Sequence, residues 1–203
     1  MFEIIGRDLP STSPACAVVN EVRQEIARIN HIVTDLLQTA RPHPARVRKS
    51  DLNTTVEHAV MLGRLPAAST SMEVVFTNDP TLPEVEHDSD QFQQVVLNLL
   101  LNALQATEGQ GKVTVTVKSQ GDFAVVEVAD NGHGIAPEHL LNIFRPFYTT
   151  KGDGTGPGLS LAQRIVEDHH GMIDVASNVG QGTIFSVMLP FQAVAAQNAT
   201  AQP

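Results

Sequence analysis

The sequence predicts an α+β domain built as a two-layer α/β sandwich, with helices on one face of a mostly antiparallel sheet and a coiled-coil-like helix before it. Three observations lead to this prediction. Helical and strand patterns alternate along residues 51–189, and the apolar run at 95–101 is far too short to cross a membrane. Valines alternate with threonines over 112–118, which is typical of a half-buried strand. Apolar residues recur every three or four positions over 15–40, which is typical of a helix that packs on a partner.

The N-terminal helix is predicted from a coiled-coil seam that lasts for three heptads. Its apolar positions are Val19, Val22, Ile26, Ile29, Val33, Leu36 and Ala40. Such a seam needs a second apolar surface, which another chain, a segment outside this sequence or the globular domain could supply. Arg41-Pro42-His43-Pro44 ends the helix, because proline cannot continue it. The basic residues within 46–49 are interpreted as part of a solvated linker.

Between residues 50 and 107, two helices and one strand are expected. A helix over 51–63 is capped by the serine or aspartate at positions 50–51, since both side chains can accept from helix N-terminal amides. Residues 73–77 have the apolar character of a strand. The aspartate or serine at positions 88–89 caps a longer helix that runs to about residue 107.

The rest of the domain is expected to contain a hairpin, two helices and two further strands. The hairpin turns at Gly121-Asp122. Pro137 suits the first position of the helix that follows the hairpin. In chain order the elements cover 112–118 (strand), 123–129 (strand), 137–143 (helix), 158–169 (helix), 172–177 (strand) and 183–189 (strand). The small, polar residues 192–203 are expected to form a disordered tail.

Composition bounds the class of protein. The 203 residues are 42% hydrophobic and 17% charged, which is typical of a folded globular chain. The net charge of −9 argues against non-specific nucleic-acid binding, which needs a basic surface. Cys16 is the single cysteine, so no intrachain disulfide can form and a cytoplasmic location is expected. Neither a signal peptide before residue 15 nor a contact with a membrane is expected.

Amide side chains line one side of the expected helix that follows positions 88–89. At about 100° per residue they fall within a sector of roughly 80°, while most other positions are apolar. The amides are Gln91, Gln94, Asn98, Asn102 and Gln105. A narrow polar stripe on an otherwise buried helix needs polar partners. The amides therefore either bond to backbone and water or line a polar pocket.

Two glycine-rich clusters follow that helix along the chain. Asp130-Asn131-Gly132-His133-Gly134-Ile135 comes after an expected strand, and Gly154-Thr155-Gly156-Pro157-Gly158-Leu159 comes before an expected helix. Backbone amides at a helix N-terminus bind anions, so the second cluster suits a phosphate. It is not a P-loop, because no Lys-Ser/Thr follows the glycines.

Together these segments resemble the nucleotide pocket of the GHKL (Bergerat) ATP-binding fold, in its sensor histidine kinase version. Asn98-Leu99-Leu100-Leu101-Asn102-Ala103 is similar to the N box, and the two glycine clusters are similar to the G1 and G2 boxes. The resemblance covers about residues 15–190. It implies that 45–191 is the ATP-binding catalytic domain, with ATP and Mg²⁺ as cofactors. Thr149-Thr150-Lys151 points to the nitrogen-regulatory branch of the family.

The resemblance assigns the metal to the N box. Asn102 would coordinate the Mg²⁺ that bridges the triphosphate, and Asn98 would support the same metal. Mg²⁺ does prefer hard oxygen ligands, amide carbonyls included. In gyrase-like and MutL-like ATPases of this fold, a glutamate that activates water stands at the position of Asn98. Asparagine cannot act as a general base, so the chain is expected to bind ATP but to hydrolyse it poorly.

Other segments are implied to hold the rest of the nucleotide. Asp130 would accept a hydrogen bond from the adenine amino group, and Gly132 and Gly134 would let the backbone approach the base. Lys151 would reach a phosphate, and Arg145 is a weaker candidate for the same role. The implied nucleotide-binding residues are Asn98, Asn102, Asp130, Gly132, Gly134, Ile135, Phe144, Lys151, Gly154, Thr155, Gly156, Gly158, Leu159 and Thr183.

Among these residues Asn98, Asn102 and Lys151 are expected to act in phosphoryl transfer. Pro157 departs from the family pattern, which has an apolar residue there, and it removes one backbone N–H from the G2 box. His133 and His139 lie near the implied pocket and are not expected to be catalytic. The pair His169-His170 ends a helix, where a partly positive charge would be stabilised.

The phosphoacceptor of a histidine kinase is missing. The family phosphorylates a histidine on the first helix of a dimerisation hairpin, within a His-Glu-x-x-Asn-Pro motif that this sequence lacks. Residues 2–9 resemble the end of that helix and 15–41 resemble the second one, so 1–44 is interpreted as a hairpin remnant with a linker. His31 is expected to be a surface histidine. The implied partners are a histidine-containing dimerisation helix, a response regulator receiver domain and a second copy of the chain through 15–41.

Two other functions stay open beside the histidine kinase. One is a conformational ATPase of the same fold, which Asn98 disfavours. The other is a non-enzymatic module in which residues 15–41 dimerise and nucleotide only biases the conformation. Pro157 and the missing acceptor leave room for this second alternative.

Overall fold

The computed structural model of the chain describes residues 45–67, 71–107, 110–146, 148–149 and 157–191. The chain divides into two units, Met1–His43 and Pro44–Pro203. All of the described residues belong to the second unit. The helix expected over 15–41 and the tail expected over 192–203 lie outside the described residues.

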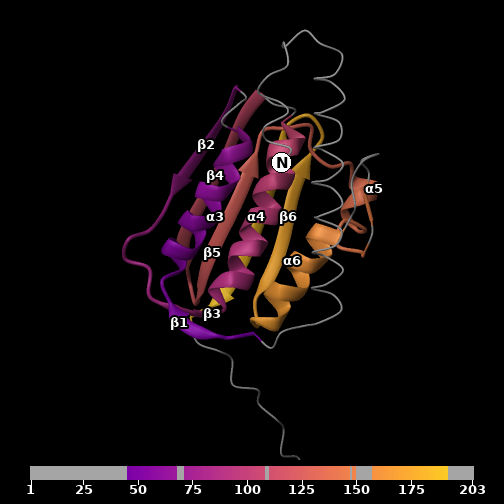
Figure 1. Cartoon of the computed structure of the whole chain (residues 1–203). Coiled ribbons are helices and arrows are strands. Elements are labelled where there is room, and N and C mark those ends of the chain that lie inside the picture. The colour runs from indigo at the N-terminus through magenta and orange to yellow at the C-terminus, as the bar shows by residue number, and fades with distance from the viewer. Residues whose placement is uncertain (1–44, 68–70, 108–109, 147, 150–156, 192–203) are drawn as a thin grey trace, which may run out of the picture. The chain divides into compact units, whose positions relative to one another are not determined.

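A five-stranded sheet forms one layer of the second unit, in the order β2-β4-β5-β7-β6 (Figure 1). The β2–β4 pair is parallel, and the other three neighbouring pairs are antiparallel. The strands are β2 (Ser71–Thr77), β4 (Gln110–Gln120), β5 (Phe123–Asp130), β6 (Met172–Asn178) and β7 (Gly182–Pro190). A small second sheet pairs β1 (Arg48–Ser50) with β3 (Val85–His87).

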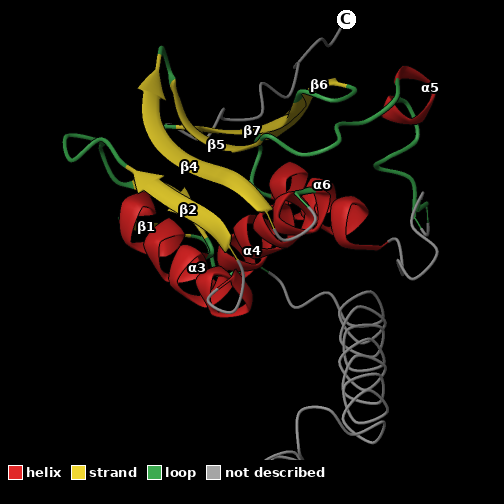
Figure 2. Ribbon diagram, turned by 90° about the horizontal axis from the view of Figure 1, so that it is seen from above, coloured by secondary structure: helices red, strands yellow, loops and turns green. Residues whose placement is uncertain are grey.

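Three helices cover one face of the large sheet, as Figure 2 shows. They are α3 (Leu52–Ala67), α4 (Ser89–Ala106) and α6 (Pro157–Asp168). The short helix α5 (Pro137–Leu140) stands apart from this layer on the β6 side. The core lies between the layers, where Phe92, Leu99 and Leu100 of α4 are fully buried. The two-layer α+β sandwich predicted from the sequence is confirmed.

Two helices differ in length from the sequence prediction. Helix α3 continues four residues past Gly63, because Gly63 is a packing position rather than a helix end. A Cβ atom there would lie 2.3 Å from Leu100 Cδ2, so the glycine lets α4 approach α3 closely. The helix that begins at Pro137 ends at Leu140 instead of continuing to residue 143.

The linker interpretation of residues 46–49 is wrong where it includes Arg48 and Lys49. Both residues belong to β1, which pairs antiparallel with β3. Both side chains are nevertheless exposed. A three-residue strand with two exposed positions shows no apolar alternation, so its sequence resembles a linker.

Helix α4 begins in a buried polar cluster. The Asp88 carboxylate caps the helix, since its Oδ1 accepts hydrogen bonds from the backbone amides of Asp90 and Gln91. Its Oδ2 accepts a hydrogen bond from the Arg46 amide at 2.6 Å. Partial burial raises the pKa of Asp88, but these backbone N–H groups outweigh that effect, and the pKa lies below its ordinary value.

His169 enters the same cluster from the end of α6. Its Nε2 accepts a hydrogen bond from the Asp88 amide at 2.9 Å, and its Nδ1 lies 2.7 Å from the Ile165 carbonyl oxygen. One nitrogen must accept and the other must donate, so the ring is neutral. The prediction that the His169-His170 pair suits a positive charge is therefore wrong for His169, which is buried.

His87 completes the cluster. Its Nδ1 lies 2.9 Å from the Val85 carbonyl oxygen, and its Nε2 lies 2.9 Å from the Thr55 hydroxyl. The side chain is fully buried. Burial lowers the pKa of His87 below its ordinary value, because a charged ring would lose its hydration.

Candidate functional site

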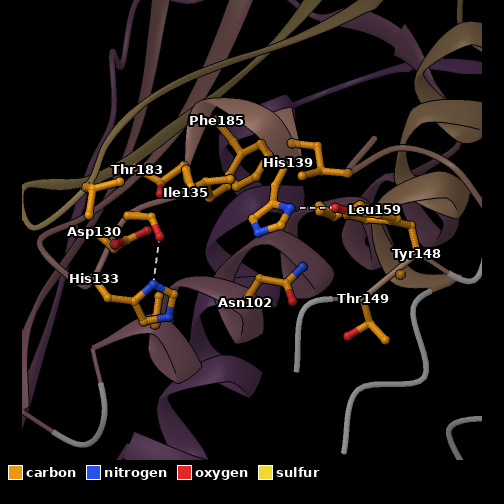
Figure 3. A pocket seen from close by; sticks show the side chains of 16 residues that line it. Asn102, Asp130, His133, Ile135, His139, Tyr148, Thr149, Leu159, Thr183 and Phe185 are labelled. Carbon is orange, nitrogen blue, oxygen red and sulfur yellow. Dashed lines mark hydrogen bonds between the residues drawn. The ribbon is translucent and has the colours of Figure 1, made fainter. Parts of the chain in front are cut away.

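A cavity of about 430 Å³ opens between the second half of α4, the start of α6 and one end of the large sheet (Figure 3). This volume is in the range of small-molecule and cofactor sites. The lining residues are Asn102, Ala106, Asp130, His133, Gly134, Ile135, Ala136, His139, Ile143, Tyr148, Thr149, Gly158, Leu159, Val179, Thr183 and Phe185.

The cavity brings together half of the residues that the resemblance implied. Seven of them line it, namely Asn102, Asp130, Gly134, Ile135, Gly158, Leu159 and Thr183. Three others, Asn98, Gly132 and Phe144, lie outside the lining. The remaining four, Lys151, Gly154, Thr155 and Gly156, fall outside the residues that the structure describes.

Strand register places the polar groups at one end of the cavity. Asp130 of β5 lies opposite Thr183 of β7, and Thr183 lies opposite Ser177 of β6. Asp130 and Thr183 are both nearly buried, with exposed fractions of 9% and 3%. Asp130 Oδ1 accepts a hydrogen bond from the Gly132 amide at 2.8 Å. A carboxylate and a hydroxyl from neighbouring strands thus stand side by side.

Ser177 organises this end of the cavity and was missed by the sequence reasoning. Its hydroxyl donates to the Gly182 carbonyl at 3.0 Å and accepts from the Ile135 amide at 2.8 Å. Thr183 Oγ1 lies 2.9 Å from Ser177 Oγ. Because the serine proton is already donated, the Thr183 hydroxyl donates to Ser177 and keeps its own oxygen as an acceptor. The role of this serine follows only from the register of β6 with β7, and no pattern within the sequence gives that register.

The glycines after Asp130 are required by the protein's own backbone. A Cβ atom on Gly132 would lie 2.3 Å from the Ala106 carbonyl oxygen at the end of α4. A Cβ atom on Gly134 would lie 2.2 Å from the Asn178 carbonyl oxygen, and Gly134 has φ +70. These two positions let the loop pack tightly between α4 and β6. Their approach to a base stays a prediction.

The two asparagines of the N box differ in position. Asn102 is half-buried and lines the cavity. Asn98 lies one turn earlier, is 7% exposed, and donates a hydrogen bond from Nδ2 to the Gly158 carbonyl at 3.2 Å. Asn98 therefore ties α4 to the first turn of α6. That turn, represented by Gly158 and Leu159, faces the cavity.

The start of α6 gives the second end of the cavity an anion-binding character. Backbone amides of a helix's first turn lack intrahelical acceptors and carry partial positive charge. Pro157 is the first residue of α6. At this position the missing N–H costs no helix hydrogen bond, although it removes one donor that a phosphate could use.

The donor set at this end fits a nucleotide-bound Mg²⁺. Among the described residues, no group of three His, Cys, Asp or Glu side chains is arranged to hold a metal ion. Mg²⁺ needs no such group when phosphate oxygens and waters fill most of its octahedron, because one or two protein oxygens then suffice. The Asn102 amide oxygen is a suitable ligand of this kind.

Residues 144–151 resemble the F box of histidine kinases and the start of their ATP lid, and two of them have different surroundings. The Phe144 ring meets the Phe185 ring edge to face, with centroids 6.4 Å apart. Since Phe185 lines the cavity, Phe144 supports the wall from behind. Arg145 is exposed and is not among the lining residues.

Two histidines and a tyrosine also line the cavity. His133 Nδ1 lies 2.6 Å from the Gly134 carbonyl oxygen, and His139 Nδ1 lies 2.7 Å from the Tyr148 hydroxyl. No catalytic role was predicted for either histidine, and Tyr148 belongs to the segment that resembles the F box but was given no role of its own.

In the part of the chain that the structure describes, no helix is long and apolar enough to cross a membrane.

Comparisons with known proteins agree with this geometry. Residues 87–193 match the family described as histidine kinase-, DNA gyrase B-, and HSP90-like ATPase, HATPase_c. The chain is 39% identical over 181 residues to the sensor histidine kinase ZraS of Escherichia coli (strain K12), which covers 89% of this chain and 39% of ZraS. It is 36% identical over 170 residues to the histidine-protein kinase AtoS of the same strain, covering 83% of this chain and 28% of AtoS. The chain thus spans about two fifths or less of these relatives.

Solved structures of histidine kinases share the fold. The catalytic domain of histidine kinase ThkA, in a nucleotide-free form, matches with a TM-score of 0.66 and 31% identity, over 72% of this chain and 96% of that one. Full-length ShkA in complex with AMPPNP matches with a TM-score of 0.75 and 27% identity, over 93% of this chain and 41% of ShkA. ThkA in complex with the response regulator TrrA matches with a TM-score of 0.74 and 26% identity, over 94% of this chain and 56% of that chain.

Proposed function

The chain belongs to the family of histidine kinase-, DNA gyrase B-, and HSP90-like ATPases, and from this premise we propose that it is the ATP-binding catalytic domain of a sensor histidine kinase. The proposed reaction transfers the γ-phosphoryl group of Mg-ATP to a histidine that this chain does not carry in the family's motif. The observation that carries the proposal is the polarity of the cavity: hydrogen-bond acceptors stand at one end and an anion-binding helix N-terminus at the other.

The acceptor end suits adenine. The Asp130 carboxylate and the Thr183 hydroxyl oxygen lie on paired positions of β5 and β7. The exocyclic amino group of adenine donates two hydrogen bonds, whereas guanine carries a carbonyl oxygen at the same place. Two acceptors facing a carbonyl would leave buried lone pairs without donors, which costs about 1–3 kcal/mol per group. We therefore propose that the site prefers ATP to GTP.

The opposite end suits a triphosphate with its metal. In this proposal the first-turn amides of α6, next to Gly158 and Leu159, donate to phosphate oxygens. Asn102 contributes its amide oxygen to the Mg²⁺, which neutralises the charge that develops on the leaving group. Lys151 and residues 154–156 are assigned phosphate contacts by the resemblance alone.

The residues expected near the phosphates favour transfer of the phosphoryl group over its hydrolysis. Among the described residues that line the cavity, the one carboxylate is Asp130, at the base end. Asn98 cannot accept a proton, and its amide nitrogen is engaged with the Gly158 carbonyl. None of the described lining residues therefore offers a carboxylate to activate water at the phosphate end, and in this proposal the γ-phosphoryl group stays available to a positioned nucleophile. The protein's part in the reaction is mainly positioning and electrostatic stabilisation.

The proposed partners follow from the same reaction. A helix that carries the acceptor histidine must reach the γ-phosphate, either from the same longer chain or from another. A response regulator receiver domain would then take the phosphoryl group, as the complex of ThkA with TrrA suggests for that kinase. Residues 15–41 are proposed to pair with a second copy. The proposed location of this part of the protein is the cytoplasm.

The test is calorimetric titration of the whole chain with Mg-ATP, with Asp130→Asn as the site variant. The exposed hairpin residue Asp122 provides the matched control, Asp122→Asn. We expect Asp130→Asn to weaken binding by about 10- to 100-fold, the loss of a charge-assisted hydrogen bond, and Asp122→Asn to bind like the wild type. A wild-type chain that binds no Mg-ATP contradicts the proposal.

A second assay on the same sample separates transfer from hydrolysis. A folded dimerisation hairpin bearing the histidine of a relative is added with labelled ATP, and both protein labelling and free phosphate are measured. Labelling with negligible phosphate release is expected. Sustained release that disappears in Asn102→Ala would assign the chain to the conformational ATPases instead.

A further inference from the structure

We propose that His139 is an additional nucleotide-contacting residue, held in place by Tyr148, and that its Nε2–H donates a hydrogen bond to the part of ATP between the base and the terminal phosphates. This inference rests on the proposed ATP binding. It adds a ligand contact that none of the N, G1, F or G2 segments supplies.

The backbone between Ala136 and Tyr148 brings the two side chains together. The amides of His139, Asn142, Arg145 and Tyr148 each donate to the carbonyl three residues earlier, at 2.8 to 3.1 Å. These turns lead the chain from His139 to Tyr148, and the two side chains meet at the cavity although they are nine positions apart.

The contact between the two side chains is short. The Tyr148 hydroxyl lies 2.7 Å from His139 Nδ1, and the ring centroids are 6.2 Å apart with an interplanar angle of 53°. Both residues are half-buried, and both line the cavity. A hydroxyl at this distance lies within the usual hydrogen-bond range.

The position of the imidazole makes this contact relevant to a ligand. Figure 3 shows the His139 ring in the middle of the view of the cavity, with Asp130 to one side, Leu159 to the other and Asn102 below it. Its second ring nitrogen points away from Tyr148, toward the space between His133 and Asn102. A nucleotide that spans from Asp130 to Asn102 has its ribose and α-phosphate at this point.

The chemistry of the pair fixes the direction of the second hydrogen bond. When the tyrosine hydroxyl donates to Nδ1, a neutral imidazole carries its proton on Nε2. That N–H is then a donor aimed into the cavity, and ribose and phosphate oxygens are acceptors. Tyr148 is thus a positioning residue, which acts through His139 and does not touch the nucleotide.

The test is a double-mutant cycle on ATP affinity with His139→Phe and Tyr148→Phe, in which each variant keeps an aromatic ring. Loss of the donor is expected to weaken Mg-ATP binding about five- to tenfold in His139→Phe. Loss of orientation is expected to weaken it about two- to threefold in Tyr148→Phe. The double variant should bind like His139→Phe alone, because Tyr148 acts only through the histidine. The exposed His58 gives the control, His58→Phe, with unchanged affinity.

A spectroscopic readout separates ligand contact from mere loop packing. In the wild-type chain loaded with a non-hydrolysable ATP analogue, imidazole ¹⁵N shifts should show His139 protonated on Nε2, and Tyr148→Phe should show a mixture of tautomers. If His139→Phe does not fold, this comparison in Tyr148→Phe decides alone. Titrations with adenosine and with AMP locate the acceptor: a deficit with both assigns the ribose, and a deficit with AMP alone assigns the α-phosphate.

Three results would overturn the proposal. His139→Phe could bind ATP as tightly as the wild type while Asp130→Asn does not, which rejects this contact and leaves the nucleotide site intact. The effects of the two single variants could add in the double variant, which would make Tyr148 an independent contact. His139 could also be protonated on Nδ1 in the loaded wild type. A wild-type chain without ATP binding is a different outcome, since it rejects the proposed function itself.

Discussion

Polar side chains gather at both ends of α4, but their situations are opposite. At the N-terminal end, Asp88, His87 and His169 are buried and bond to one another's backbone or to nearby groups. At the C-terminal end, Asn102 borders an open cavity of about 430 Å³. One cluster is closed by the protein, whereas the other leaves room for a ligand.

This difference separates structural polar groups from functional ones better than residue type does. A buried polar group that is fully satisfied within the protein stabilises and orients the fold. A polar group that faces a cavity completes its hydrogen bonds only with water or a ligand. Changes at the closed end should therefore alter stability and spare nucleotide affinity, and changes at the open end should do the reverse.

The largest expected effect is at the closed end, in His169→Ala. The variant leaves the buried Asp88 amide without its acceptor and creates a cavity where the imidazole was, so the free energy of unfolding should fall by about 3–4 kcal/mol. Chemical denaturation measures this loss. Glu167 of α6 is exposed, and Glu167→Ala should change stability by no more than about 0.5 kcal/mol. Equal losses in both variants would remove the distinction between the two ends.

The next effect is at the open end, in Asn102→Ala. Loss of the proposed metal ligand should weaken Mg-ATP binding by about tenfold or more, while binding of metal-free ATP changes little. The free energy of unfolding should stay near that of the wild type. Titrations with and without Mg²⁺ measure the contrast, and Gln93→Ala, which lies off the cavity side of α4, serves as the control. A deficit that is the same without metal would argue against a magnesium ligand.

A smaller effect is expected from acid, and it should arise at the closed end. Burial lowers the pKa of His87 in the folded chain, so below its ordinary pKa of about 6.5 the unfolded chain binds a proton that the folded chain does not. Stability should accordingly fall as the pH drops from 7 toward 5. The slope should be shallower in His87→Gln, measured by denaturation at several pH values. An unchanged slope would show that His87 is not the group responsible.

Asp88 should add a second loss at lower pH. The pKa of Asp88 is also held below its ordinary value, so its contribution is present above about pH 4 and disappears as the carboxylate takes up a proton. Asp88→Asn should lack this acid-dependent loss, which the same denaturation series measures below pH 4.

The smallest effect is expected at Pro157. Pro157→Leu restores one N–H at the first position of α6 and should tighten ATP binding by no more than about two- to threefold. Calorimetry against Pro83→Leu, a change in an exposed loop, detects a difference of this size. A weaker affinity in Pro157→Leu would mean that the fixed φ of proline matters more than the added donor.

Local patterns in the sequence predicted most of the fold. The hairpin at Gly121-Asp122, the cap at Asp88 and the amphipathic α4 follow from turn chemistry, capping and periodicity, which are properties of neighbouring residues. The β1–β3 pair and the length of α3 depend on contacts between distant segments, such as Gly63 against Leu100. Patterns within one segment cannot report these contacts.

The same distinction applies to the candidate site. Asn102, Asp130 and Thr183 were found because family motifs mark them, and the structure brings them to one cavity. Ser177 stands in no motif, and its importance depends on the register of β6 with β7. Tyr148 lies in the segment that resembles the F box, but its contact with His139 depends on the turns between residues 136 and 148. Asn98 was assigned to the metal, yet its observed hydrogen bond joins α4 to α6. A motif identifies a residue without giving its full set of contacts.

The hydrogen bond from Arg46 to Asp88 has a mechanical consequence. It fixes the segment before β1 to the very residue that caps α4. From Asp88 to Asn102 the helix is a rod of about 21 Å, at 1.5 Å per residue. A tilt of roughly 5° imposed at Arg46 would displace the far end by about 2 Å, more than a metal ligand or an in-line phosphoryl acceptor tolerates. A displacement of Arg46 would thus be passed along α4 to Asn102, at the end of the helix that borders the cavity.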